Sequence, residues 1–176
     1  GLITNVGGFS SSRPLNESEI ARRTDILQSS IALFNDDDVE ILPQTMPPFP
    51  WHFGGQQFHN LFVEREWIKT FCTENNLKIC LDVSHSYLAC NNLNSSFSQF
   101  LDEILPFTRH IHLADALGVD GEGLQINDGE IDFGLIFEKI KENCPDATWI
   151  PEVWQGHEND GYGLKTALQR LSHFAI

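Results

Sequence analysis

Four polar side chains stand at the ends of four apolar runs in the sequence. Gln44 follows "ILP", Asp82 follows "ICL", His112 follows "HI" and Glu152 follows "WIP". An amide, two carboxylates and an imidazole form a mixed oxygen and nitrogen ligand set that suits Mn2+, Mg2+, Co2+ or Zn2+. A lone Asp or His at such a place usually caps a loop. Four of them at equivalent places in successive runs favour one shared divalent-metal site.

The elements that must position these side chains repeat along the chain as an apolar run, a loop and an amphipathic segment. Successive runs start roughly 30 to 40 residues apart, which is the length of a βα unit with an elaborated loop. This alternation predicts a parallel sheet covered by helices, either an open doubly wound sheet or part of a (β/α)8 barrel. The runs cover residues 2–6, 39–44, 78–83, 110–115 and 148–153.

The polar residues favour the barrel, because parallel strands place their active sites at their carboxyl ends, where neighbouring side chains converge. No glycine-rich nucleotide fingerprint follows any of the runs. Glu40 lies on the same face as Gln44 but about 13 Å below it at roughly 3.3 Å per residue. Glu40 is therefore the fallback ligand, to be preferred only if the strand register slips.

Composition limits the classes of partner. The chain has 176 residues, of which 41% are hydrophobic, and this suffices for a single globular domain over residues 1–176. A formal charge of -14 opposes binding to a phosphate backbone, so nucleic acid is disfavoured. No long apolar run or signal peptide is present, so we expect no membrane insertion. The four cysteines lack a CxxC spacing, and we interpret them as reduced thiols of a cytoplasmic protein.

Several segments resemble one family of barrels. "ICLDVSHSYLAC", "HIHLADALGVDGEGLQINDGEIDF" and "WIPEVWQGH" resemble the last three βα units of the xylose isomerase-like TIM barrels, and "LITNVGGFS" and "ILPQTMPP" the two units before them. This family includes sugar phosphate isomerases and epimerases and AP endonuclease family 2. The most specific motifs are Asp82-x-x-His85 and His112-x-x-Asp115, the latter followed by a glycine-rich acidic loop.

The resemblance implies a role for each matching residue. A divalent metal of unknown identity is expected on Asp82, His112 and Glu152, with Gln44 at the place where the family usually has a glutamate. Glu152 is expected to act as the acid-base group, and His85 to contact the substrate. A neutral amide cannot accept a proton at neutral pH, which puts two-base epimerisation by Gln44 and Glu152 in doubt.

The loops supply further candidate residues. Asp120 and Glu122 stand where the endonucleases have an Asp-x-His metal pair, so they are either further metal ligands or parts of a solvated turn. Four aromatic or imidazole side chains could form a lid or a sugar-stacking surface, although packing on the barrel rim would explain them equally well. These four are Trp51, His52, Trp154 and His157.

The resemblance covers only about the last five βα units of a barrel, and five strands cannot close one. We expect either a larger parent polypeptide that supplies the first strands or pairing with another chain, including a homo-oligomer. The function that this pattern favours is a metal-dependent isomerase or epimerase acting on a sugar or sugar phosphate. The alternatives are a sugar-binding or assembly module weakened by the change at Gln44 and, third, an AP endonuclease-like phosphodiesterase.

Overall fold

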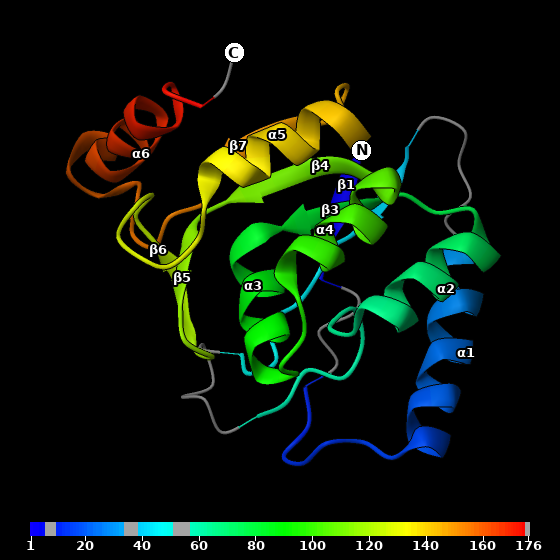
Figure 1. Ribbon diagram of the computed structural model, residues 1–176. Helices are drawn as coiled ribbons and strands as arrows, with labels where there is room; N and C mark the ends of the chain where they lie inside the picture. The colour runs from blue at the N-terminus through cyan, green and yellow to red at the C-terminus, as the bar shows by residue number, and fades with distance from the viewer. Residues whose placement is uncertain (6–9, 34–38, 51–56, 175–176) are drawn as a thin grey trace.

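Five parallel strands run through the part of the chain that the computed structural model describes, residues 1–5, 10–33, 39–50 and 57–174. The strands lie in the order β1-β2-β3-β4-β7, with β2 joined to β3 through a single parallel bridge between Gln44 and Cys80. All five predicted runs therefore form strands of one parallel arrangement (Figure 1). The strands are β1 (Leu2–Thr4), β2 (Ile41–Pro43), β3 (Ile79–Asp82), β4 (Thr108–Leu113) and β7 (Thr148–Pro151).

Helices connect these strands. Side chains accept hydrogen bonds from backbone N–H groups at the starts of four helices, where the first amides lack intrahelical partners: Asn16 caps α1, Asp82 caps α3, Ser96 caps α4 and Asp132 caps α5. The helices are α1 (Glu17–Leu33), α2 (Arg65–Asn75), α3 (Val83–Asn92), α4 (Phe97–Ile104), α5 (Phe133–Asn143) and α6 (Glu158–Leu171), with a short 3-10 helix at Leu105–Phe107.

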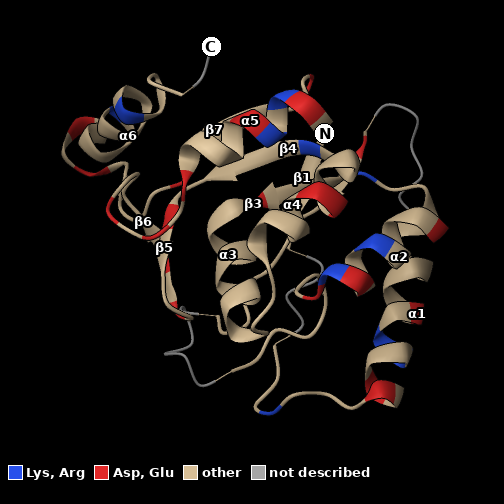
Figure 2. Ribbon diagram, in the orientation of Figure 1, with Lys and Arg blue, Asp and Glu red and all other residues tan. Residues whose placement is uncertain are grey.

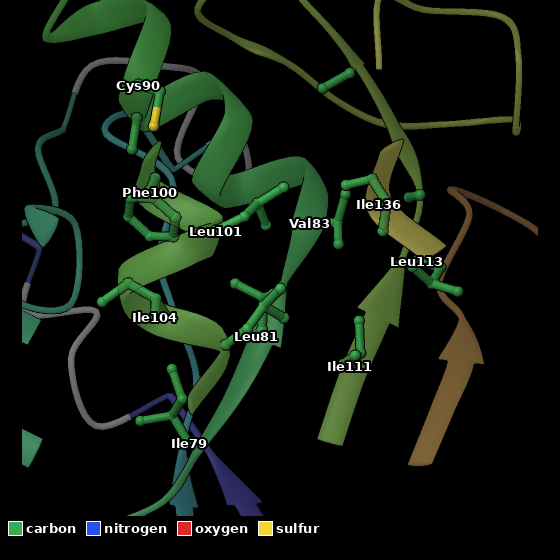
Figure 3. Packing of buried hydrophobic residues seen from close by; sticks show 14 of the residues in the cluster. Ile79, Leu81, Val83, Cys90, Phe100, Leu101, Ile104, Ile111, Leu113 and Ile136 are labelled. Atoms are coloured by element: carbon green, nitrogen blue, oxygen red, sulfur yellow. The ribbon is translucent and has the colours of Figure 1, made fainter. Parts of the chain in front are cut away.

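The core lies between the strands and the helices that cover one face of them. Alternate residues of a strand point to opposite faces, so Ile79 and Leu81 of β3 share a face, as do Ile111 and Leu113 of β4. All four are fully buried. Figure 3 shows them beside side chains of α4 and α5. The intervening residues of the same strands must point to the opposite face, away from these helices.

An antiparallel hairpin, β5 (Asp115–Leu117) and β6 (Gly121–Leu124), follows β4 where the sequence indicated a loop. Asp115, at the base of the hairpin, is fully buried. Its carboxylate accepts hydrogen bonds from the backbone N–H groups of Ala116, Gly129 and Ile131 at 2.8 to 3.0 Å. The Asp115 carboxylate thus ties the hairpin to the segment that leads to α5.

All four cysteines are free and buried, as predicted for unpaired thiols. Burial raises the pKa of Cys72 to about 12 and that of Cys90 to about 11, so these thiols are protonated at neutral pH. Among the described residues, none of the helices has the length and apolar character needed to cross a bilayer.

Candidate metal centre and cavity

The predicted ligands lie on the face of the strands that points away from α4 and α5. Asp82 is paired in register with His112, and His112 with Ile150. Glu152 lies two residues beyond Ile150, just past the end of β7, and its backbone N–H donates to the carbonyl of Leu113 at 2.9 Å. The carboxyl ends of β3, β4 and β7 therefore bring Asp82, His112 and Glu152 together, as the sequence indicated.

These three side chains form a tight cluster. One ligand atom from each lies within 4.8 Å of those of the other two. His112 Nδ1 is 2.5 Å from Glu152 Oε2 and 3.8 Å from Asp82 Oδ2. Two carboxylates and an imidazole are a ligand set found around Zn2+ and Mn2+ in proteins. Among the described residues, these three side chains are a group of His, Asp and Glu residues close enough together to hold one metal ion.

His112 supplies the strongest local sign of a ligand site. The side chain is 8% exposed; Nδ1 faces the Glu152 carboxylate, and Nε2 has no hydrogen-bond partner among the described residues. Leaving a buried polar atom without a partner costs roughly 1 to 3 kcal/mol. A metal ion between His112 and its two carboxylate neighbours would provide the missing partner, so the residues fit a divalent cation.

Burial and neighbouring charges shift the pKa of each of the three side chains in the cluster. Burial raises the pKa of Asp82, and the nearby charge of Glu152 adds to this effect. Burial opposes the charge on His112, but the adjacent Glu152 carboxylate outweighs it and raises the pKa of His112. Partial burial acts to raise the pKa of Glu152, whose side chain is 54% exposed, but His112 lowers it on balance. Glu152 and His112 therefore stabilise each other's charged forms.

Gln44 is the fourth predicted ligand, and it lies directly against the cluster. The side chain is 5% exposed, and its Nε2 donates to Asp82 Oδ2 at 3.0 Å. The Gln44 side chain thus donates to the Asp82 carboxylate in this arrangement. That the Gln44 amide oxygen binds a metal ion stays a prediction. Glu40, the fallback ligand, lies 3.6 Å from Arg109 Nε and outside the cluster, which supports the register that places Gln44 here.

His85 lies in the first turn of α3, where Asp82 holds it. Asp82 Oδ1 accepts a hydrogen bond from the His85 backbone N–H at 2.9 Å. The ring Nδ1 is 3.0 Å from the carbonyl oxygen of Thr45, an acceptor, which places the ring proton on Nδ1. The other nitrogen, Nε2, lies 3.6 Å from Glu122 Oε2.

A cavity of about 300 Å³ opens beside the cluster. Its lining carries a high proportion of acidic groups. Glu122 reaches it from β6 with its side chain only 14% exposed, and burial raises the pKa of Glu122. Trp154, 59% exposed, forms part of the wall. The lining residues are Asp82, Ser84, His85, Ala114, Glu122, Gly123, Glu152, Val153, Trp154 and Gln155.

The remaining predicted residues lie away from this cavity or outside the described structure. Asp120 does not line the cavity; it lines a neighbouring hollow of about 230 Å³, which shares Glu122 and Trp154 with the cavity wall. His157 is exposed at the start of α6 and is not part of the cavity wall. Trp51 and His52 fall outside the described residues.

Sequence reasoning missed two polar side chains that support the site. Thr45 Oγ1 donates to the carbonyl of Asp82 at 3.2 Å and accepts from the Asp82 backbone N–H at 2.9 Å, which joins β2 to β3 beneath the cluster. Ser84 Oγ accepts from the backbone N–H of Gly123 and so fixes the hairpin. Thr45 directly follows Gln44, and Ser84 lies two residues after Asp82. This closeness to two predicted ligands is the sequence signal that could have identified them.

Solved structures with the same fold include sugar 3-epimerases and an endonuclease. A D-tagatose 3-epimerase-like protein is 21% identical with a TM-score of 0.67, and the match covers 89% of this chain and 57% of that one. A D-psicose 3-epimerase is 14% identical (TM-score 0.64, 92% and 57% covered). Endonuclease IV from Thermus thermophilus is 18% identical (TM-score 0.59, 88% and 58% covered).

The chain thus spans less than two thirds of the length of these proteins, as a partial barrel does. No functionally curated protein matches the sequence. The family model described as "Xylose isomerase-like TIM barrel" matches residues 2–173. The chain therefore belongs to the xylose isomerase-like TIM barrel family.

Proposed function

We propose that this chain carries the metal centre of a divalent-metal-dependent isomerase or epimerase that acts on a sugar or sugar phosphate. The observation that carries the proposal is the cluster of Asp82, His112 and Glu152, in which His112 Nε2 is buried without a hydrogen-bond partner among the described residues and which opens into an acidic cavity. The sugar 3-epimerases that share the fold agree with this reaction class.

Asp82, His112 and Glu152 would hold the metal, which, when bound, would polarise the carbonyl and hydroxyl oxygens of a sugar. Glu152 would accept the proton from the carbon next to that carbonyl. The lowered pKa of Glu152 keeps it ionised at neutral pH, as a base must be. His85 Nε2, with the ring proton held on Nδ1, can accept a hydrogen bond from a sugar hydroxyl. The indole of Trp154 offers an apolar surface to the sugar ring.

A second function is favoured by one observation. The amide of Gln44 donates to Asp82 where a second carboxylate would assist proton transfer. A barrel with this change could bind a sugar without converting it. The third candidate, phosphodiester cleavage, is disfavoured by the formal charge of -14, because a phosphate backbone would be repelled.

The first test is the metal content of the purified protein, measured by elemental mass spectrometry beside the Asp82→Ala, His112→Ala double variant. Glu142→Ala, on an exposed part of α5, is the matched control. We expect about one divalent ion per chain in the protein and in the control, and none in the double variant. Circular dichroism checks that all three proteins are folded.

The second test is hydrogen exchange into ketoses and their phosphates in D2O. Metal binding with exchange at the carbon next to the carbonyl supports the enzyme. Metal binding together with sugar affinity but without exchange favours the binding module. A folded protein that takes up no ion from added Mn2+, Co2+ or Zn2+ would overturn the metal centre.

A further inference from the structure

Glu122 is a half-buried carboxyl group that the metal cluster does not use. It belongs to β6, and its side chain lines the same cavity as Glu152 while remaining outside the Asp82, His112 and Glu152 cluster. The two glutamates reach the cavity from different elements, Glu122 from the hairpin and Glu152 from the end of β7. A substrate in the cavity would therefore have two carboxyl groups beside it.

The hairpin holds Glu122 in a defined place. The next residue, Gly123, donates its backbone N–H to Ser84 Oγ at 3.0 Å and accepts at its carbonyl from the Trp154 backbone N–H at 2.7 Å. Gly123 has φ +69, and an added Cβ would lie 3.4 Å from the Trp154 side chain. These contacts fasten the hairpin to α3 on one side and to the loop after β7 on the other.

Inverting a carbon centre beside a carbonyl requires a proton to leave one face and another to arrive on the opposite face. Two acid-base groups on opposite sides of the carbon would meet this need, whereas one group returns the proton to the face it came from. Glu152 supplies one group. Gln44 cannot supply the other, since an amide neither gains nor loses a proton at neutral pH.

We propose, resting on the proposed function, that Glu122 is the second acid-base group of this cavity and makes the reaction an epimerisation. Glu152 takes the proton from carbon, and the C–H electron pair moves into the adjacent C=O to give an enediolate. Glu122, in its carboxylic acid form, gives its proton to the opposite face of that carbon, and the C=O forms again. Water at the cavity mouth then removes a proton from Glu152 and returns one to Glu122. His85 Nε2, 3.6 Å away, faces the Glu122 carboxyl group and is placed to orient it.

The test compares Glu122→Gln with Glu130→Gln, a matched change at an exposed residue that contacts Gly118 of the same hairpin. Each protein, loaded with the metal it binds, is incubated with ketohexoses and ketopentoses in D2O. Chromatography measures the inverted sugar, and mass spectrometry measures deuterium in the sugar that was not inverted. Metal content is measured in parallel.

We expect Glu122→Gln to keep its metal and to slow inversion at least about 100-fold, within the range for loss of an acid-base group. Deuterium should still enter the unchanged sugar, because Glu152 can remove and return a proton on one face. Glu122→Asp should recover part of the inversion. Glu130→Gln should behave like the unmodified protein.

Three results would overturn the assignment of Glu122 while leaving the proposed function standing. They are wild-type inversion by Glu122→Gln, loss of metal from that variant, and equal loss of inversion in Glu130→Gln. If the unmodified, metal-loaded protein neither inverts nor deuterates any of the sugars, the proposed function fails, and the role of Glu122 fails with it.

Discussion

Replacing Gln44 by glutamate would place two carboxylates against each other in a buried site. Gln44 Nε2 lies 3.0 Å from Asp82 Oδ2, so an oxygen of the introduced glutamate would take nearly the same place. Two full charges at this distance repel by about 5 kcal/mol at an effective dielectric constant of about 20. The pair would avoid most of this repulsion by sharing a proton, as close carboxyl pairs do.

We therefore expect metal-free Gln44→Glu to lose about 2 kcal/mol of unfolding free energy, the scale of a disrupted buried polar contact. For a chain of this size, this corresponds to a fall of about 4 to 8 °C in melting temperature. A divalent ion would relieve the repulsion, so the variant should bind Mn2+ or Co2+ at least about tenfold more tightly, a gain of about 1.4 kcal/mol. Thermal unfolding with and without metal, together with calorimetric titration, measures both effects.

Gln44→Met is the matched control, because it removes the donor to Asp82 without adding charge. It should also be less stable than the unmodified protein, but its affinity for metal should not rise. The reasoning is refuted if Gln44→Glu binds metal no more tightly than Gln44→Met, because the side chain at position 44 would then not face the bound ion.

Two further predictions concern His112 in the cluster and Asp115 at the base of the hairpin. The raised pKa of His112 means that its protonated form stabilises the metal-free fold fully below the ordinary value of about 6.5, and that this contribution is lost as the pH rises through the folded pKa. Because a metal needs the neutral imidazole, metal affinity measured by titration should rise with pH through that pKa, and His112→Asn should abolish the step. Asp115→Ala should lower the unfolding free energy in urea by about 2 to 4 kcal/mol, since it leaves buried backbone N–H groups without acceptors. Exposed Glu142→Ala should change the unfolding free energy by less than about 0.5 kcal/mol, and equal effects of the two substitutions would contradict the role given to Asp115.

The strands and the convergence of the three candidate ligands could be predicted because each strand and its polar residue follow from a short stretch of sequence. Each strand is a short apolar run, and the alternation of its side chains decides which residue faces the site. The residues Asp82 and His112 also share a register in the sheet, so their convergence follows once the strands are parallel. Glu152 lies beyond the end of its strand, yet it reaches the same place.

The helix α3 could not be predicted because it lacks an apolar stripe. Residues on several sides of α3 are buried, including the polar residues Ser84 and Ser86. The sequence of α3 therefore lacks the alternation of apolar and polar residues every 3.6 positions that indicates a surface helix. In Figure 2, α3 carries neither Lys, Arg, Asp nor Glu. The same figure shows acidic residues on the β5–β6 hairpin, which resembles a solvated turn when only the sequence is considered.

The hairpin escaped prediction for another reason. Its strands contain three and four residues, too few for a periodic signal, and its place depends on contacts from distant parts of the chain. The hydroxyl of Ser84 and the backbone N–H of Trp154 come from two other βα units. The position of Glu122 in the cavity is therefore a tertiary property, which the spacing of residues around it does not contain.

Asp82 shows why one short motif determines so much of the site. One carboxylate oxygen caps α3 through the His85 backbone N–H, while the other faces Gln44 and His112. The Asp82 carboxylate thus sets the start of the helix, the place of the His85 backbone and the position of the cluster together. Because one side chain does all three, any change that moves α3 relative to β3 also moves the candidate ligands. This coupling explains how a site open to solvent on one side can keep its geometry.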